Sequence, residues 1–384
     1  MNAIRLGHVH ATDAREAVRQ FHAAVYQPGM ALVLFFCSSS YDLKQLADEM
    51  RLQFADTQVV GCTTAGELGV DGIGDQGLTG VSFPSTQFTA VSDCFESLKA
   101  FDPERGRLFA TNLERRLNAS AADNQTNIFS WLMVDGLSFR EELVAWTFQN
   151  SLVGTPLVGG SAGDGLKFES TLVFHKGCFH TDSAVLVMVK TVYPVKPFMI
   201  QHFVPTERRF VITDAEPEKR LVREIDGLPA AQVYAELIGV DPENLDPMRF
   251  AATPMVVSIG GVSYVRSISH VLPDGSLKLF CAIEEGVVLR LAQGESMLER
   301  MQQQFTTLRE ELGEPLVILG CDCVLRRIEM NEKHLIAPMG AIMKRNRVVG
   351  FHSYGEQYGG VHVNQTFTGL AIGKGLDVYE RLNQ

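Results

Sequence analysis

The stretch Val349–Glu356, VGFHSYGE, contains the pattern from which the organisation of the whole chain can be inferred. It begins as an apolar strand and continues into a turn that ends in a glycine and an acid. Two earlier stretches have the same plan, VVGCTTAGE at 59–67 and LVGGSAGD at 157–164. Alignment of their Val-Gly pairs places three residues at one position of the turn: Thr63, Ser161 and His352. The chain therefore contains one structural element three times.

Each turn belongs to a longer repeat of strand, crossover, strand, turn and strand. The copies begin at the apolar strands MALVLFFCSS, NIFSWLMVDGLS and PLVILGCDCVLRR and end at the strands GLTGVSF, SAVLVMV and TFTGLAIG. Val, Ile, Leu and Phe dominate these strands, which is typical of strands covered on both faces. The crossovers YDLKQLADEMRLQF and REELVAWTFQNSL have helical spacing, which places helices against sheets. The repeats predict a mixed α/β (α+β) fold with β-sheets packed against helices.

The region 195–315, between the second and third copies, has a different pattern. A DG turn and Pro229 precede the predicted helix AAQVYAEL. The stretch VSYVRSISHVLPDGSLKLFCAI predicts a hairpin around an Asp-Gly turn, and QGESMLERMQQQFTTLREELGEP predicts a long amphipathic helix. We place a domain boundary near residue 220, which divides the chain into 1–220 and 221–384.

The composition indicates a folded, acidic and cytoplasmic protein. The 384 residues are 46% apolar and 21% charged, and a net charge of −11 disfavours nucleic acid and anionic membranes as partners. The apolar runs are shorter than the roughly 20 residues of a membrane span. The N-terminus lacks the features of a secretory signal. Seven scattered cysteines do not suggest a disulfide framework.

Four stretches, in this order, carry a resemblance to a known family. They are VVGCTTAGEL, GGSAGDGLKFESTLVFHKG, EIDGLPAAQVY and GFHSYGEQ…HVNQTFTGLAI, spread over residues 30–372. With them the chain resembles the FIST sensory family, named for F-box and intracellular signal transduction proteins. The resemblance implies a FIST N-terminal domain over 1–220, a FIST C-terminal domain over 221–384, and a cytoplasmic ligand-sensing module with no catalytic role of its own.

One branch of that family consists of haem proteins that sense nitric oxide and act on a partner histidine kinase or cyclic-di-GMP enzyme. A chain without a fused output domain, as here, is similar to this branch. The resemblance therefore implies haem b as the cofactor, nitric oxide as the ligand and a signalling enzyme as the partner, with a homodimer left open. Other members are thought to bind amino-acid-like metabolites, so a receptor without haem is the alternative.

The expected axial ligand of the haem is His352. Haem needs a ligand on a firm element, an apolar slot and cations near its propionates. Phe351, Tyr354 and Tyr358 are close in sequence and are expected to wall the slot. The cations nearby are Arg326, Arg327, Lys344, Arg345 and Arg347.

His352 is preferred because it departs from the threonine and serine of the other two turns, and from the hydroxyl or aromatic residue usual in family members. His362 and His175 are the reserve ligands. His8 and His10 are expected in a mobile N-terminal arm, where they are poor candidates for a site.

Other side chains support alternative interpretations. GGSAG around Ser161 matches the G-x-S-x-G elbow of a serine hydrolase, in which Asp164 and a histidine would complete a triad. The other two turns lack the serine, which favours a structural role for these glycines. Glu67, Asp164 and Glu356 end the three turns and either line a shared cavity or bond to turn amides.

Two further groups of residues are candidates for binding. Cys321 and Cys323, with Cys281 and His334, would form a metal site, but the C-x-C spacing is short for zinc and buried cysteines pack as small hydrophobes. Arg266 and the pair Asn364-Gln365 are candidates for holding a polar small ligand in the receptor interpretation.

Overall fold

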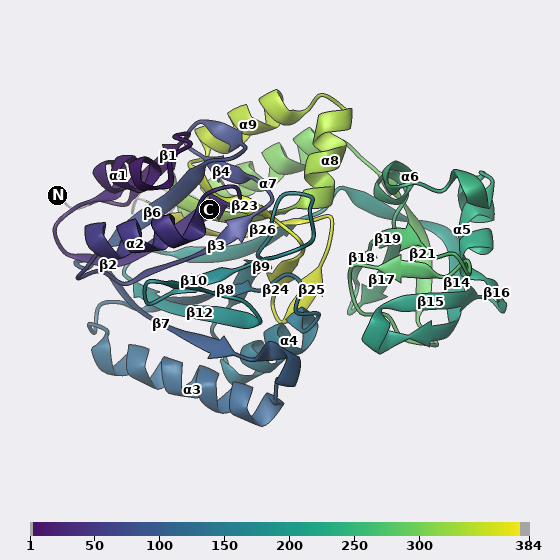
Figure 1. Ribbon diagram of the computed structural model, residues 1–384, viewed down its shortest axis with the longest axis horizontal. Helices are drawn as coiled ribbons and strands as arrows, with labels where there is room; N and C mark the ends of the chain where they lie inside the picture. Colours follow the sequence, from purple (N-terminus) through teal and green to yellow (C-terminus); the bar gives the residue numbers. More distant parts are fainter. Residues whose placement is uncertain (1–2, 377–384) are drawn as a thin grey trace.

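The computed structural model describes residues 3–376, which form a body of three repeats and a smaller inserted domain (Figure 1). Repeat 1 contains β1 (Arg5–Val9), α1 (Ala14–Val25), β2 (Met30–Ser38), α2 (Leu43–Gln53), β3 (Val59–Thr64), β4 (Glu67–Gly69), β5 (Gly72–Gly74) and β6 (Leu78–Pro84). Repeat 2 contains β7 (Phe88–Glu96), α3 (Pro103–Ser120), β8 (Asn127–Val134), α4 (Glu141–Ser151), β9 (Leu157–Ser161), β10 (Val173–His175), β11 (Cys178–His180) and β12 (Ser183–Thr191).

Repeat 3 is interrupted by the inserted domain. It contains β13 (Val195–Ile200) and, after the insertion, α7 (Met297–Leu312), β22 (Pro315–Cys323), α8 (Val324–Glu332), α9 (Ile336–Arg345), β23 (Val348–Ser353), β24 (Glu356–Tyr358), β25 (Val361–Val363) and β26 (Phe367–Gly373). The inserted domain contains β14 (Phe203–Glu216), β15 (Leu221–Ile225), β16 (Leu228–Pro229), α5 (Ala230–Ile238), α6 (Pro247–Ala252), β17 (Met255–Ile259), β18 (Val262–Arg266), β19 (Ile268–Val271), β20 (Leu277–Leu279) and β21 (Val288–Gly294).

Within residues 3–376, the body contains three six-stranded sheets with the same strand order, and each repeat supplies the first four strands of one sheet. The orders are β1-β6-β2-β3-β10-β11, β7-β12-β8-β9-β24-β25 and β13-β26-β22-β23-β4-β5. The last two strands of every sheet form a hairpin that comes from another repeat. The hairpin of repeat 1 joins the sheet of repeat 3, that of repeat 3 joins repeat 2, and that of repeat 2 joins repeat 1. This exchange closes the repeats into a ring.

The three sheets surround one apolar core. Phe36, Trp131 and Phe351, one from each sheet, belong to it. The outer face of each sheet is covered by helices, with α1 and α2 on repeat 1, α3 and α4 on repeat 2, and α7 and α9 on repeat 3 (Figure 1). Because successive side chains of a strand alternate, Phe36 enters the central core while Phe35 contacts the helices. Both faces of β2 are therefore buried, which accounts for its continuous apolar sequence.

One glycine in each repeat allows the parallel strands to approach. Gly61, Gly159 and Gly350 lie opposite Phe35, Leu132 and Gly320 in the parallel registers. A Cβ at these three glycines would come within 2.4, 1.9 and 1.7 Å of the partner's carbonyl oxygen. The shared Val-Gly pair thus reflects the same backbone contact made three times.

The predicted mixed α/β class is confirmed, and the predicted secondary structure of the inserted region is largely found. The helix expected after Pro229 is α5, the long amphipathic helix is α7, and the Asp-Gly hairpin is β19–β20. The third crossover, which had no assigned structure, contains α8 and α9. Among the described residues, no helix combines the length and apolar character needed to cross a bilayer.

The inserted domain leaves and re-enters the body at adjacent points. Its β14 follows β13 after two residues, and the main-chain nitrogen of Glu295 donates to the carbonyl of His202 at 2.7 Å, joining the two connections. The domain has an apolar core of its own around Tyr234 and Phe250. The boundary expected near residue 220 falls between β14 and β15, which pair with each other.

The three Gly-rich turns meet and hydrogen-bond to one another. Main-chain bonds join each pair: Ala65 N donates to His352 O (2.9 Å), Gly163 N to Thr63 O (3.0 Å) and Ser161 N to Gly355 O (2.8 Å). The aligned positions of the three turns therefore occupy equivalent places at the ends of β3, β9 and β23.

Two of the turn acids have matching buried environments. Glu356 accepts hydrogen bonds from the hydroxyls of Ser353 (2.6 Å) and Thr366 (2.7 Å), and Glu67 accepts one from Thr64 (2.6 Å). Burial raises the pKa of Glu356 to about 8 and that of Glu67 to about 7. These acids bond to groups of the turns and of the segments that follow them.

Replacement of Glu356 by Gln is expected to flatten the pH dependence of stability. The folded-state pKa of Glu356 lies above the value of 4.5 for an unperturbed Glu, so between these pH values the folded state holds a proton that the unfolded state has released. Stability contributed by this group is therefore lost as pH rises from about 4.5 to about 8, by about 1.4 kcal/mol per pH unit at most. Gln resembles the protonated acid, and denaturant unfolding at pH 5 and pH 8 measures the difference.

The matched control is Glu224→Gln, because Glu224 is an exposed residue of β15. Its profile should follow that of the unmodified chain. Parallel pH profiles for all three proteins would show that Glu356 is ionised alike in the folded and unfolded states, contrary to this expectation.

Candidate functional site

His352, the expected haem ligand, lies inside the body at the end of β23. Its side chain is fully buried, and its Nδ1 is 3.8 Å from Oδ2 of Asp322. Burial, followed by the charges of Arg327 and Arg326, lowers the pKa of His352 well below its ordinary value. Arg326 is also fully buried, and its Nε donates to Asp322 at 2.5 Å. Arg326 is therefore held in an internal ion pair beside His352.

The aromatic residues expected around His352 lie in different surroundings. Phe351 stacks on Phe36 in the central core, with ring centroids 4.8 Å apart. Because His352 is the next residue on β23, its side chain projects from the opposite face of the sheet to that of Phe351. Phe351 and His352 therefore do not line one haem slot. The hydroxyl of Tyr354 donates to the carboxylate of Asp164, and Tyr358 lies half-buried on β24.

The hydrolase and cysteine candidates are also buried. The hydroxyl of Ser161 accepts a hydrogen bond from the amide of Gln357 at 2.9 Å, and this amide lies between the serine and His362. Asp164 accepts from three main-chain nitrogens as well as from Tyr354.

The four members of the expected metal group lie in separate environments. Cys321 belongs to the central core, and Cys323 to a small neighbouring cluster. Cys281 is buried in the inserted domain, and His334 is exposed after α8. Burial raises the pKa of all three thiols, so the neutral thiol is favoured over the metal-binding thiolate.

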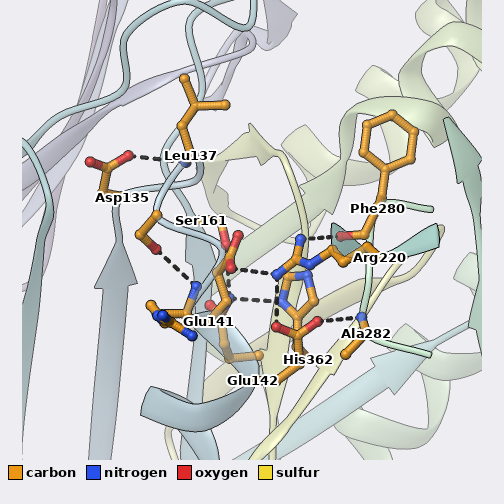
Figure 2. Close-up of polar contacts among 12 residues, drawn as sticks. Asp135, Leu137, Glu141, Glu142, Ser161, Arg220, Phe280, Ala282 and His362 are labelled. Atoms are coloured by element: carbon orange, nitrogen blue, oxygen red, sulfur yellow. Dashed lines mark hydrogen bonds and ion pairs between the residues drawn. The ribbon is translucent and has the colours of Figure 1, made fainter. Parts of the chain in front are cut away.

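Arg220 of the inserted domain makes a buried ionic contact with the body (Figure 2). Arg220 reaches from the start of β15 to the first turn of α4, where its Nη2 lies 2.7 Å from carboxylate oxygens of both Glu141 and Glu142. Its Nη1 donates to the carbonyl of Phe280 at 2.5 Å. Glu142 also accepts from the main-chain nitrogen of Ala282 at 2.8 Å. We call these contacts the junction clamp.

The charges of the junction clamp are affected by the helix terminus and by burial. Carboxylates in the first turn of a helix are stabilised by the helix dipole. Burial nevertheless raises the pKa of Glu141 to about 7, against the opposing effect of Arg220. Burial also acts to raise the pKa of Glu142, but the charges of His362 and Arg220 outweigh it, and the pKa is lowered. The Arg220 side chain is 5% exposed, so this ion cluster is removed from solvent and each partner needs the others.

A cavity of about 380 Å³ lies beside the clamp, and we call it the junction cavity. Its lining comes from α4, the inserted domain and the β24–β25 hairpin of repeat 3: Glu142, Leu143, Trp146, Arg266, Cys281, Ala282, Gly360, Val361 and His362. Trp146 is 59% exposed and Leu143 is 36% exposed at its rim. Three separate parts of the chain thus contribute to one site of the size that small ligands use.

His362 is one of the titratable groups that line this cavity. The residue is buried, its Nδ1 is 3.2 Å from the amide nitrogen of Gln357, and its Nε2 has no hydrogen-bond partner among the described residues. Burial lowers the pKa of His362 to about 4, with Glu142 opposing the shift. The ring is therefore neutral near pH 7, as a metal-ligating imidazole must be.

The amide of Gln357 can select the tautomer of His362. With its nitrogen toward the ring it donates to Nδ1, and the ring proton then lies on Nε2. With its oxygen toward the ring it accepts from Nδ1–H, which leaves the lone pair on Nε2 for a ligand. The amide oxygen of Gln357 is itself without a partner among the described residues.

The second reserve, His175, lines another cavity. This cavity of about 530 Å³ is bordered by apolar residues including Met50 and Phe54 and by Arg51, Arg116 and Lys176. Burial lowers the pKa of His175, and a hydrogen bond with the main chain of Ser92 opposes the shift. Two of the three expected histidines, His175 and His362, are therefore at cavities.

No pattern in the sequence indicated the junction clamp. Glu141 and Glu142 were visible only as acids at the start of a predicted helix, and nothing near Arg220 in sequence indicated its partners. The guanidinium of Arg220 bonds to Glu141 and Glu142, which lie 79 and 78 positions earlier in the sequence.

Two protein-family models match the chain. The model of the FIST N domain matches residues 31–228, and that of the FIST C domain matches residues 230–359. The two matches meet within the inserted domain, so each includes part of the body. A search of curated proteins finds no match to the chain.

Replacement of Arg220 by Met is expected to destabilise the chain by about 3–5 kcal/mol, because it leaves Glu141 buried without its cation. The loss should shrink at low pH, where Glu141 takes up a proton. Denaturant unfolding measures the change, and limited proteolysis tests whether the inserted domain becomes the first part to be cut.

Arg223→Met is the matched control. Arg223 is exposed and pairs with Glu216, so its loss should cost less than about 1 kcal/mol. Equal losses in the two variants would mean that the clamp contributes no more than a surface ion pair.

Proposed function

Because the chain belongs to the FIST family, whose domains sense small ligands, we propose that it is a haem-binding sensor of nitric oxide with its haem in the junction cavity. The observation that carries the proposal is His362, a neutral buried imidazole at that cavity whose Nε2 has no hydrogen-bond partner among residues 3–376. We assign the axial ligand to His362 in preference to His352. The ring nitrogens of His352 also lack hydrogen-bond partners among the described residues, but His352 is fully buried beside Asp322 and Arg326 and does not line the junction cavity.

The donor set of the junction cavity suits a haem. His362 provides an imidazole nitrogen, with Gln357 to set its tautomer. Arg266 lines the same cavity and has no carboxylate partner among the described residues, so it is suited to a propionate. When bound, haem supplies an iron that takes a diatomic ligand.

The apolar rim also supports a large flat ligand. Trp146 and Leu143 are exposed on neighbouring turns of α4, beside the half-buried Val361. Exposed apolar groups gathered at a cavity commonly mark a binding surface. A macrocycle lying against them would remove this area from water and leave its propionate edge near Arg266.

The position of the cavity provides a route for signalling. Its walls belong to both the body and the inserted domain, so a ligand contacts two parts that meet at the junction clamp. A ligand shifts an equilibrium only by binding two states unequally. A change at His362 would be transmitted to Gln357 on β24 and to Glu142, whose carboxylate contacts the inserted domain.

We propose that the output is read by a partner histidine kinase or cyclic-di-GMP enzyme. This part of the proposal is supported by the resemblance to the nitric-oxide-sensing branch of the family. The partner would recognise a surface that changes when the inserted domain moves relative to α4.

Replacement of His362 by Gly is expected to abolish stoichiometric haem binding, because the iron loses its protein ligand. The measurement is the Soret band during titration with haem, in the ferric and ferrous states and with nitric oxide. Added imidazole should restore the band in His362→Gly, since a free ligand can enter the space that the side chain leaves.

His352→Ala and His175→Ala are the matched controls and should keep the wild-type spectrum. Loss of the band in either of them, with His362→Gly unchanged, would move the ligand to that histidine. Absence of any saturable band in the wild type would overturn the haem proposal and leave the junction cavity to an amino-acid-like metabolite, which a shift in melting temperature would detect.

A further inference from the structure

Two histidines near the N-terminus lie on the same side of a paired strand. His8 belongs to β1, which pairs with β6 in the sheet of repeat 1, and His10 follows directly after it. The mobile arm expected from the sequence is not found, because pairing with β6 holds the segment from Arg5 to Val9. Because side chains alternate along a strand, the H-x-H spacing puts both imidazoles on one face. Their ring centroids are 4.4 Å apart.

The tip of an exchanged hairpin brings a carboxylate to these rings. Asp71 lies between β4 and β5, which belong to the sheet of repeat 3. Its Oδ2 is 3.8 Å from Nδ1 of His8 and 3.6 Å from Nε2 of His10. One ligand atom from each of the three residues lies within 4.8 Å of the other two. The three groups therefore converge, although they come from two sheets.

His8 is buried without the hydrogen bonds that such burial normally requires. Its side chain is 1% exposed, and neither ring nitrogen has a hydrogen-bond partner among the described residues. Buried polar atoms are usually paired, and an unpaired one calls for an explanation. A Cβ on Gly69 would come within 2.7 Å of Nδ1, and one on Gly74 within 3.0 Å of Nε2, so glycines make room for the ring.

We propose that His8, His10 and Asp71 form a binding site for a divalent transition-metal ion of the zinc class. Two imidazoles and one carboxylate are a donor set that Zn²⁺ uses when water completes its coordination. Hard cations such as Ca²⁺ and Mg²⁺ prefer oxygen ligands throughout, so the imidazoles select against them. The proposal is independent of haem, because the site lies on repeat 1 and shares no residue with the junction cavity.

A bound metal would require the three ligand atoms, which lie within 4.8 Å of one another, to move closer together. Ligand atoms about 2.0–2.1 Å from a tetrahedral zinc lie somewhat more than 3 Å from one another. The present separations of 3.6 and 3.8 Å between nitrogen and oxygen are slightly larger. His10 and Asp71 have side chains 55% and 54% exposed, which leaves them free to close on the buried His8 and leaves open positions for water. Burial lowers the pKa of His8 to about 4, so no proton must be displaced from it near pH 7.

A bound ion would link two sheets of the body. β1 is the edge strand of one sheet, and the β4–β5 hairpin forms the edge of another. The ion would hold the tip of the β4–β5 hairpin against β1. Both elements belong to repeat 1, although the hairpin pairs with the sheet of repeat 3. Because such an ion binds the folded chain and not the unfolded chain, it would stabilise the body.

The test uses the full chain without an affinity tag, freed of metal by a chelator. Co²⁺ is the probe, because its visible absorption reports nitrogen and oxygen ligation, and Zn²⁺ is then added to displace it. We expect one Co²⁺ per chain, displacement by Zn²⁺, and binding weaker by about 100-fold or more in Asp71→Asn and in His10→Gln. Zn²⁺ should raise the melting temperature of the wild type and leave that of both variants unchanged.

The control is His334→Gln, which removes an exposed histidine elsewhere and should bind Co²⁺ like the wild type. Asp71 and His10 are more than half exposed, so their replacement tests the site without disturbing the core. The proposal is overturned if the wild type takes up no stoichiometric Co²⁺, or if Asp71→Asn and His10→Gln bind it as tightly as His334→Gln does.

Discussion

The exchange of hairpins between repeats is the constraint on which the rest of the structure depends. No repeat completes its own sheet, because the last two strands of each sheet come from another repeat. The central apolar core exists only where the three sheets face one another. The contacts that close the ring join segments far apart in the chain, so folding of the body requires all three repeats together. Gly61, Gly159 and Gly350 permit the parallel pairing inside every sheet.

The inserted domain contacts more than one repeat of this ring. It interrupts repeat 3 after β13, and it docks both on repeat 2, where Arg220 meets Glu141 and Glu142, and on repeat 3, where Ser267 and Ala251 hydrogen-bond to Gln365. The junction therefore joins two repeats as well as two domains. The junction cavity is lined by residues of repeat 2, of repeat 3 and of the inserted domain. A site built in this way responds to the arrangement of the parts around it, which suits a sensor better than a cavity inside a single rigid sheet.

Buried charged groups lie beside the turn that carries His352. Asp322 and Arg326 form a fully buried ion pair beside it, and Nη1 of Arg326 is 3.2 Å from Nδ1 of His202. His202 in turn contacts Glu329 at 3.0 Å and lies where the chain leaves for the inserted domain. The ring nitrogens of His352 have no hydrogen-bond partner among the described residues, so the ring packs beside these groups without bonding to them. The polar network thus runs from the meeting point of the turns to the domain connection.

The sequence by itself determined the repeats, the mixed α/β class and several helices and a hairpin, because these follow from patterns within about 20 residues. The repeated Val-Gly pairs were also visible in the sequence, because the same close backbone contact requires a glycine in each of the three repeats. Only the tertiary structure decided which repeat receives each hairpin, that Arg220 reaches Glu141, and that Asp71 reaches His8. Contacts between distant segments impose no spacing on the chain, and a single charged residue looks the same on a solvated surface as in a buried ion pair.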